Sequence, residues 1–293
     1  MSNAGQKYGD FRGQSGKTAF RGRRRHGIKT DEFNRCSLFV VLLASMTSQE
    51  AALSSAYDHC RAISLGHYEN FPVGSVLIPK AVRHHFYALY AYMRSADDLA
   101  DLPSRPPQER LDLLADWRRQ LDDGIKGKEP ENPIFLALCN TIRECDLPSE
   151  PLYRLLEAFE FDAKGNVQFE TFEDLRWYTS RSADPVGQLV LALFGYRDAE
   201  RIRLSNEICT ALQLLNFIQD IQEDLGNKRF YYPQEDCSIF GFEIGTGDPD
   251  TDRLALVSLF ELERVESLLD RGARLSESVS GRLRYELRAI TCA

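Results

Sequence analysis

The sequence predicts an all-α fold in one domain. Apolar residues recur at helical spacing along most of the chain, and no segment alternates apolar and polar residues as a strand does. The chain has no internal repeat, and its low-complexity residues are confined to an N-terminal arm. Of its 293 residues, 43% are hydrophobic and 27% are charged, as in an ordinary soluble globular protein. We therefore expect one helical domain over residues 47–293, preceded by a leader over residues 1–46.

The first half of the chain contains five predicted helices. Pro103 and Pro107 end the second of them, because proline cannot continue a helix. Ser149 followed by Pro151 opens the fifth in the same way that capped helices begin. These helices are expected at residues 48–65, 79–101, 108–125, 132–145 and 149–163.

The second half begins with a capping-box pattern, in which Thr171 is followed three residues later by Asp174. Asp184 is a predicted N-cap with Pro185 in the first helical position. The longest predicted helix runs over residues 198–225, roughly 40 Å at 1.5 Å per residue, and ends at Gly226. Two further helices are expected at residues 254–278 and 282–290.

The net charge of −8 hides an uneven distribution. Residues 1–45 carry nine basic and three acidic residues, a net charge of +6, and the remaining 248 residues carry 27 basic and 41 acidic ones, a net charge of −14. A basic arm of this kind can bind nucleic acid or an anionic membrane. We expect instead a disordered leader, with Met46 as a plausible start of the folded part, and we expect no nucleic-acid partner.

The cysteines, histidines and apolar segments indicate which metal sites, disulfides and membrane spans the chain can form. The seven cysteines form no CxxC motif, which argues against a zinc site or a disulfide framework and fits a reducing, cytoplasmic compartment. The apolar run over residues 36–44 is too short to cross a bilayer. His84 and His85 belong to no HExxH motif, so we expect them at a helix surface and assign them no role.

Two acidic clusters carry the chemistry. In each, carboxylates stand four residues apart on one helix face, as Asp97 and Asp101 in the first cluster and Asp220 and Asp224 in the second. Like charges at this spacing destabilise a helix by a few tenths of a kcal/mol. Such repulsion on two segments otherwise suited to a core indicates a counter-charge from outside. Magnesium commonly bridges carboxylates to substrate phosphates, so the clusters predict a diphosphate-handling enzyme.

Polar residues continue each of these faces. Tyr90 and Arg94 precede the first cluster, and Gln213 and Asn216 precede the second, at spacings of three and four. If the two helices oppose one another, their carboxylates converge around divalent cations that hold a diphosphate. Arg94 adds a guanidinium that can bind phosphate in a bidentate manner. Abundant phenylalanine and tyrosine would shield and stabilise a carbocation formed when the diphosphate leaves.

At these residues the chain resembles the squalene/phytoene synthase family. The resemblance covers roughly residues 55–290, and it is strongest in three segments. They are YALYAYMRSADDLAD over residues 87–101, YTSRSADPVG over residues 178–187 and QLLNFIQDIQED over residues 213–224. The resemblance implies an all-α isoprenoid synthase fold with a central cavity, and a prenyl diphosphate substrate.

The resemblance also implies roles for individual residues. The Mg²⁺ ligands would be Asp97, Asp98, Asp101, Asp220 and Asp224. The residues in contact with the diphosphate or the departing group would be Tyr90, Arg94, Gln213, Asn216, Arg229 and Tyr231.

Two departures from the family pattern indicate a branch. Residues 69–74 read ENFPVG in place of a serine-rich segment, and Gln219 precedes the second cluster where many members have arginine. Both features resemble the hydroxysqualene synthase branch of bacterial hopanoid synthesis. That branch ionises presqualene diphosphate and lets water capture the cation without a reductant. Glu69 and Asn70 are candidates to position that water, and Gln219 to select the diphosphate.

Other readings remain open at this point. The nearest are synthases that join two farnesyl or geranylgeranyl diphosphates head to head, giving presqualene diphosphate, dehydrosqualene or phytoene. A head-to-tail prenyl synthase or a terpene cyclase would need a different second motif from the one at residues 220–224. A non-catalytic assembly factor on the same fold is favoured only by the basic arm. The chain also ends at Ala293, earlier than relatives usually do. The apolar substrate that the resemblance implies indicates work at a membrane surface, with the inner membrane as the candidate.

Overall fold

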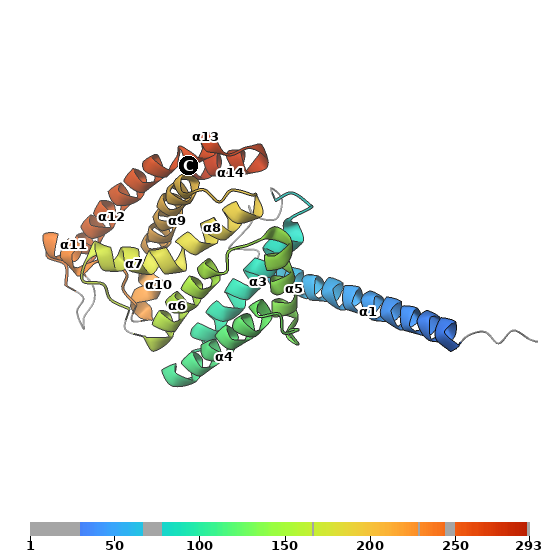
Figure 1. Cartoon of the computed structure of the whole chain (residues 1–293). Helices are drawn as coiled ribbons and strands as arrows, with labels where there is room; N and C mark the ends of the chain where they lie inside the picture. The colour runs from blue at the N-terminus through green and yellow to red at the C-terminus, as the bar shows by residue number, and fades with distance from the viewer. Residues whose placement is uncertain (1–29, 67–77, 166, 228, 244–249, 292–293) are drawn as a thin grey trace, which may run out of the picture. The chain divides into compact units, whose positions relative to one another are not determined.

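The computed structural model describes residues 30–66, 78–165, 167–227, 229–243 and 250–291. These residues form helices and no strand, which confirms the all-α prediction (Figure 1). Two compact units divide the chain, Met1–Ser48 and Gln49–Ala293. The helices are α1 (Thr30–Gly66), α3 (Arg83–Ala100), α4 (Pro107–Ile125), α5 (Pro133–Cys145), α6 (Glu150–Lys164), α7 (Phe172–Ser182), α8 (Asp184–Leu193), α9 (Ala199–Gln219), α10 (Ile221–Gly226), α11 (Gln234–Ile239), α12 (Thr251–Gly272), α13 (Leu275–Ser278) and α14 (Gly281–Thr291).

Side-chain caps begin several helices where the sequence predicted them. Thr171 and Asp174 form the complete capping box of α7, each side chain bonding the backbone of the other residue. Asp198 accepts a hydrogen bond from the backbone of Arg201 at the start of α9. Asn132 caps α5 in the same manner. These caps satisfy backbone N–H groups that have no partner within the helix.

Three predicted boundaries were wrong. The helix over residues 198–225 is interrupted at Asp220, whose backbone leaves the helical region at φ −96° and ψ 7°. The helix over residues 254–278 is likewise divided between α12 and α13. Asp184 does not cap α8, since Ala183 occupies the cap position. The Asp184 carboxylate instead accepts a hydrogen bond from Thr210 and lies 3.6 Å from the guanidinium of Arg176.

Most of the N-terminal segment lies outside the residues that the structure describes. Helix α1 begins at Thr30, well before the predicted start at residue 48. Residues 1–29 lie outside the described part, as do the side chains of residues 30–47. The disordered leader over residues 1–46 and the domain over residues 47–293 therefore stay predictions.

The unit Gln49–Ala293 buries three groups of apolar side chains. One lies between α3, α4, α5 and α6, with Ala56 and Cys60 of α1 packed into it. The second lies between α6, α7, α9 and α12, and the third joins α8 and α9 to α13 and α14. Within this unit α6 packs against both α3 and α8, and α8 packs against α9 (Figure 1). The helices with the two acidic clusters are therefore joined through α6 and α8.

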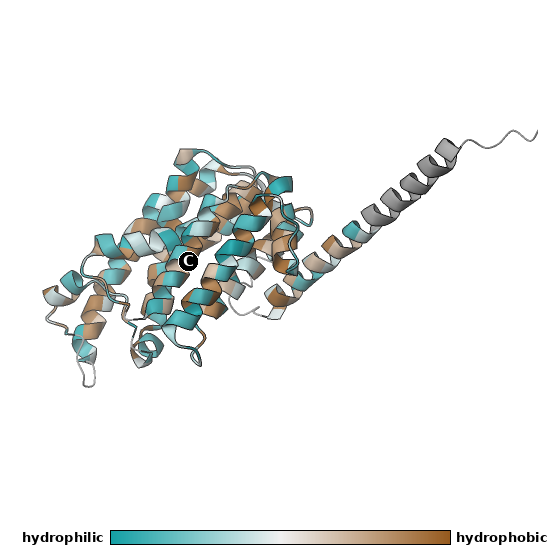
Figure 2. Ribbon diagram, turned by 60° about the horizontal axis from the view of Figure 1, so that its bottom comes forward, coloured by the Kyte–Doolittle hydropathy of each residue, from teal (hydrophilic) through white to brown (hydrophobic). Residues whose placement is uncertain are grey.

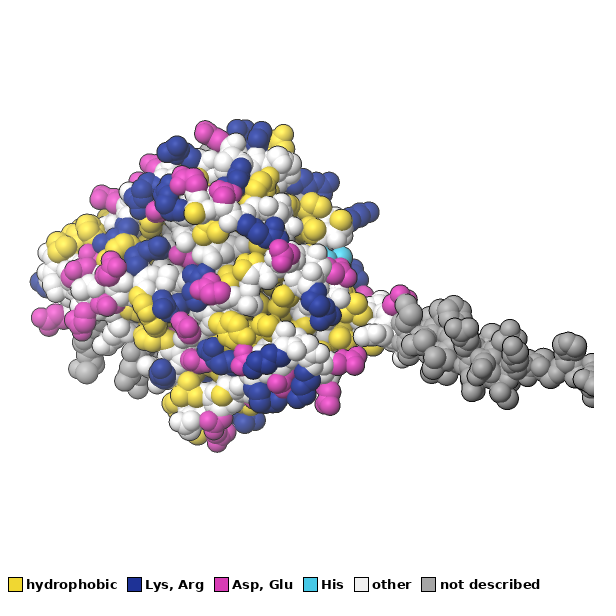
Figure 3. Space-filling view, viewed as in Figure 1, with side chains coloured by type: hydrophobic (Ala, Val, Ile, Leu, Met, Phe, Trp, Pro, Cys, Tyr) yellow, Lys and Arg dark blue, Asp and Glu magenta, His cyan; other side chains and the backbone are white. Residues whose placement is uncertain are grey.

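The helices carry their polar residues outward. Hydrophilic and hydrophobic residues alternate around most helices of the unit Gln49–Ala293, as amphipathic helices require (Figure 2). On the face shown in Figure 3, acidic and basic side chains are interspersed rather than gathered by sign.

None of the described helices has an apolar stretch sufficient to cross a bilayer. Five cysteines of the described part are free thiols, namely Cys60, Cys139, Cys145, Cys209 and Cys237.

Gly272 permits close packing of α12 on α9. A Cβ atom at this position would lie 2.5 Å from Ile208 Cγ1 and 3.1 Å from the backbone oxygen of Leu204. We therefore expect Gly272→Ala to lower the free energy of unfolding by about 1–3 kcal/mol, measured by urea denaturation. Gly66→Ala is the control, because nothing lies within 4 Å of a Cβ atom there. Equal stability of the two variants would contradict this close packing.

Candidate active site

The first acidic cluster lies at the C-terminal end of α3. Arg94 Nη1 lies 3.3 Å from Asp97 Oδ2, and Arg94 Nη2 lies 2.7 Å from Asp98 Oδ1. Burial, followed by repulsion from Asp101, raises the pKa of Asp97 to about 6, although Arg94 opposes the shift. Tyr90, one turn earlier, is buried beside this cluster. The predicted face of α3 is therefore formed as expected.

The second cluster lies at the break between α9 and α10. Asp220 occupies the break itself, and its backbone oxygen accepts a hydrogen bond from Asp224 N at 2.9 Å. Residues in such a bridge conformation are frequent in active sites. Burial raises the pKa of Asp224 to about 6, with further contributions from Asp220 and Glu223 and an opposing one from Arg229. A carboxyl group with this pKa is mostly ionised at pH 7.

Arg229 joins the two clusters. Its guanidinium forms an ion pair with Asp101 of the first cluster, and its backbone N–H donates to Asp224 O of the second at 2.8 Å. Its positive charge opposes the rise that burial causes in the pKa values of Asp97, Asp162 and Asp224. The structure therefore brings the predicted carboxylates of α3 and α10 to one place, around one cation of the chain itself.

Asp162 is a functional candidate that the sequence analysis missed. It lies near the end of α6, and its Oδ2 accepts a hydrogen bond from Tyr178 at 2.8 Å. Its Oδ1 is buried without a hydrogen-bond partner. Burial raises the pKa of Asp162 to about 7; the hydrogen bond from Tyr178 and the charge of Arg229 oppose the shift, and Asp101 and Asp97 add to it. An orphaned buried oxygen near three charged groups, Arg229, Asp101 and Asp97, is typical of a functional site.

One sequence signal for Asp162 existed. It falls seven residues after Leu155 and four after Ala158, both of which are buried, so it lies on the apolar stripe of its helix. A carboxyl group on such a stripe is rarely accidental, because burying it costs free energy. Tyr178 lies within one of the segments that carried the family resemblance, but that reasoning assigned it no role.

An apolar pocket opens beside the first cluster. It has a volume of about 200 Å³ and is lined by Tyr90, Met93, Arg94, Asp97, Leu155, Phe159, Ser182 and Val186. Sites for drug-sized ligands typically measure about 300–1,000 Å³. The pocket is therefore suited to a short apolar segment beside a charged group rather than to a whole ligand of that size. Arg94 Nε and Ser182 Oγ are buried there without hydrogen-bond partners.

Aromatic rings surround the Tyr178 side of the site. Tyr231 stacks on Phe217 with ring centroids 3.9 Å apart and an interplanar angle of 4°. Tyr178 lies 5.9 Å from Tyr231 and 5.5 Å from Phe169, measured between centroids. Ring faces of this kind stabilise a cation by their quadrupole. Burial raises the pKa of Tyr178 well above its ordinary value, so its phenol stays neutral.

The remaining predicted residues divide into two groups. Gln213 of α9 is partly buried, while Asn216 and Gln219 are exposed next to the break at Asp220. Glu69 and Asn70, proposed to position water, lie outside the described residues. Their roles stay predictions.

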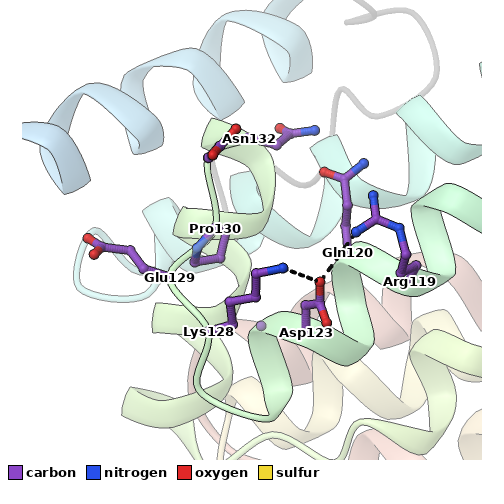
Figure 4. A pocket seen from close by; sticks show the side chains of 9 residues that line it. Arg119, Gln120, Asp123, Lys128, Glu129, Pro130 and Asn132 are labelled. Carbon is purple, nitrogen blue, oxygen red and sulfur yellow. Dashed lines mark hydrogen bonds and ion pairs between the residues drawn. The ribbon is translucent and has the colours of Figure 1, made fainter.

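A larger pocket elsewhere carries no comparable chemistry. It has a volume of about 590 Å³ and lies between the end of α4 and the start of α5 (Figure 4). Both of its basic side chains are paired with the same acid, since Lys128 Nζ lies 2.9 Å and Arg119 Nη1 lies 3.3 Å from Asp123 Oδ2. The candidate active site is therefore the smaller pocket with the acidic clusters.

The residues present fit divalent cations. Carboxylates from two helices converge, burial raises the pKa of two of them, and hard oxygen ligands are those that Mg²⁺ prefers. The residues that would hold the ions are Asp97 of α3, Asp101 at its C-cap, Asp220 at the break and Asp224 of α10. Asp98, which like Asp97 pairs with Arg94, is a further candidate.

The bridging role of Arg229 predicts a pH-dependent loss of stability. In Arg229→Met the carboxylates lose their counter-charge, which costs about 2 kcal/mol of unfolding free energy at pH 8, where they are ionised. At pH 5 Asp97, Asp162 and Asp224 are mostly protonated, because burial raises their pKa values to about 6 or 7. The loss of unfolding free energy should therefore be much smaller at pH 5 than at pH 8. Urea denaturation at both pH values measures this.

The control is Arg203→Met, which removes an exposed arginine paired with Glu200 and Glu207 on the surface of α9. It should cost little at either pH. An Arg229→Met loss that is the same at pH 5 and pH 8 would refute the bridging role.

Comparisons with known proteins identify the family of the chain. The sequence model of the squalene/phytoene synthase family matches residues 65–291. The structure of squalene synthase HpnC from Alicyclobacillus acidocaldarius is similar with a TM-score of 0.73 and 38% identity, over 82% of this chain and 90% of that one. The 15-cis-phytoene synthase of Synechococcus elongatus is 29% identical over 76% of each chain. The presqualene diphosphate synthase of Rhodopseudomonas palustris is 30% identical over 60% of this chain and 61% of its own. The chain therefore belongs to the squalene/phytoene synthase family.

Proposed function

We propose that the protein is a hydroxysqualene synthase of hopanoid biosynthesis. It cleaves the C–O bond of presqualene diphosphate, and water adds to the resulting carbocation and loses a proton, giving hydroxysqualene and diphosphate. The observation that carries this proposal is the uncharged Gln219, exposed directly before Asp220 at the helix break. The similarity to squalene synthase HpnC, at 38% identity, supports the same branch.

The acidic clusters would hold the diphosphate through Mg²⁺. When bound, Mg²⁺ neutralises the charge that develops on the leaving diphosphate. Asp97 and Asp101 approach from one side and Asp220 and Asp224 from the other. Arg94, whose Nε is buried without a partner, is placed to donate hydrogen bonds to phosphate oxygens. Arg229 would exchange part of its ion pair with Asp101 for the diphosphate.

The apolar side of the site would manage the carbocation. The apolar side chains of the pocket, Tyr90 and Phe159 among them, would cover part of the prenyl chain. The rings around Tyr178 and Tyr231 offer faces that stabilise positive charge. Asp162 has a pKa of about 7, and it therefore can accept a proton near neutral pH while Tyr178 holds its orientation.

A second candidate is head-to-head prenyl transfer from farnesyl or geranylgeranyl diphosphate. Its support is the similarity, at 29–30% identity, to a phytoene synthase and a presqualene diphosphate synthase. Both reactions use the same diphosphate-holding residues, so the clusters alone do not distinguish them. Either substrate is strongly apolar, and we propose that the protein works in the cytoplasm at a membrane surface.

Product analysis tests the proposal. Purified protein is incubated with presqualene diphosphate and Mg²⁺ but no NADPH, in water enriched in ¹⁸O, and the products are read by mass spectrometry. Hydroxysqualene carrying ¹⁸O is the expected product. Conversion of farnesyl or geranylgeranyl diphosphate with no reaction of presqualene diphosphate would overturn the proposal in favour of the second candidate. Inertness toward all three would favour a non-catalytic protein on the same fold.

Removal of one carboxylate from either cluster should abolish turnover. In Asp97→Ala and in Asp220→Ala we expect diphosphate release to fall by at least roughly 1,000-fold, because charge stabilisation of the leaving group is lost. Far-UV circular dichroism should stay unchanged, since each substitution also removes repulsion. Asp252→Ala, an exposed carboxylate at the start of α12, is the control. Normal turnover in either cluster variant would exclude the two-cluster mechanism.

Gln219→Arg should change selectivity more than stability. An added guanidinium beside Asp220 strengthens binding of a second diphosphate, so the ratio of kcat/KM for farnesyl diphosphate to that for presqualene diphosphate should rise. Gln222→Arg, exposed on α10, is the matched control for an added charge. If the product profile and both kcat/KM values match the parent protein, Gln219 does not determine selectivity.

Asp162→Asn should separate catalysis from stability. The substitution keeps the volume and the partner of Tyr178 but removes an ionisable group that is costly to bury. We expect unfolding free energy to be unchanged or higher and kcat to fall by roughly 100-fold, within the usual range for a lost acid or base. Tyr178→Phe, which removes only the hydrogen bond, should give a smaller loss. Wild-type kcat in Asp162→Asn would leave this carboxyl group without a role in turnover.

A further inference from the structure

Two histidines and a glutamate converge at the opposite end of α3 from the acidic clusters. His84 and His85 lie in its first turn, and Glu144 lies in the last turn of α5. One ligand atom from each of the three lies within 4.8 Å of the other two. The expectation that both histidines lie at a helix surface was wrong for His85, whose exposed fraction is 5%. From His85 to Asp97 along α3 is roughly 18 Å, so this group is separate from the active site.

Hydrogen bonds fix the ring of His85. Its Nδ1 lies 2.9 Å from Thr141 Oγ1 and 3.2 Å from the hydroxyl of Tyr57, and Asn140 donates to the same hydroxyl at 3.1 Å. With Nδ1 engaged, Nε2 points toward Glu144 Oε2 at 3.6 Å. In metal sites the second nitrogen of a ligating histidine is held by such a partner, which orients the ring.

His84 completes the group from its open side. Its ring lies against that of His85 with centroids 3.9 Å apart and against the edge of Tyr57 at 4.7 Å. It also lines a pocket of about 220 Å³ together with Asp58, Arg61 and other residues. Lys80 and Arg83 also line this pocket, whereas His85 and Glu144 do not.

The negative charge of Glu144 is not balanced by an ion pair with arginine or lysine in the part of the chain that the structure describes. A neutral imidazole is the form that binds metals. The Glu144 carboxylate, whose side chain is 56% exposed, faces these rings.

We propose that His84, His85 and Glu144 bind a divalent transition-metal cation of the zinc type. Two imidazole nitrogens and one carboxylate oxygen form a three-residue ligand set that zinc accepts with water in the fourth position. Such a set discriminates against Mg²⁺, which prefers oxygen ligands alone. The ion would tie the start of α3 to the end of α5 and so stabilise the helix that carries the first acidic cluster.

Cobalt and zinc titrations test the site. The untagged protein, held in excess Mg²⁺ to occupy the aspartates, is titrated with Co²⁺ while its visible absorption is recorded, and Zn²⁺ is then used to displace the cobalt. We expect one Co²⁺ per chain with nitrogen ligands. His84→Ala and Glu144→Gln should each weaken the Zn²⁺ affinity by roughly 10-fold or more. His59→Ala is the matched control, because it removes an exposed histidine elsewhere on α1.

Thermal unfolding gives a second readout that does not depend on enzymatic activity. Zn²⁺ should raise the Tm of the parent protein and of His59→Ala, but not of His84→Ala. Circular dichroism in the absence of zinc verifies that each variant is folded. Absence of a cobalt spectrum, or equal zinc affinity in the parent and in His84→Ala, would overturn the proposal. The group would then be a hydrogen-bonded core cluster only.

Discussion

Repulsion between carboxylates at the meeting of α3, α6 and α10 is the constraint on which the active site depends. Asp97, Asp162 and Asp224 come from three helices, and burial raises the pKa of each of them. Arg229 is placed among them and pairs with Asp101. With Arg94, which pairs with Asp97 and Asp98, the site has two guanidinium groups, and they cannot balance six carboxylates (Asp97, Asp98, Asp101, Asp162, Asp220 and Asp224) when all are ionised. The surplus of negative charge is what a cluster of divalent cations carrying a diphosphate would neutralise.

The residues around these carboxylates change from polar and exposed on one side to apolar on the other. On one side lie the exposed Asn216, Gln219 and Asp220, close to solvent at the break after α9. On the other lie the pocket beside Phe159 and the stacked rings of Phe217 and Tyr231. A substrate with a charged head and an apolar tail has one favourable orientation in such a gradient. Asp162 and Tyr178 connect the charged and the aromatic side chains, since Tyr178 donates a hydrogen bond to Asp162 and its ring centroid lies 5.9 Å from that of Tyr231.

Much of this could be predicted from the sequence, because the relevant patterns are local. Helical spacing and capping residues predicted the all-α fold, and carboxylates four residues apart predicted both acidic clusters. What escaped prediction depends on tertiary contacts. The break at Asp220 depends on one backbone conformation, and the importance of Asp162 depends on Tyr178 and Arg229, which are distant in sequence. His85 became buried because Thr141 and Tyr57 receive its ring, and no local pattern signals those partners.

The most direct test of the central claim is cation-dependent diphosphate binding, measured by calorimetry with inorganic diphosphate and Mn²⁺ in place of Mg²⁺. The convergence of the two clusters predicts that diphosphate binds tightly only with Mn²⁺ present. It also predicts that neutralising a single carboxylate on either side, by Asp101→Asn or Asp224→Asn, weakens that binding comparably. Tight binding without the cation, or binding that survives loss of one cluster, would contradict a shared site.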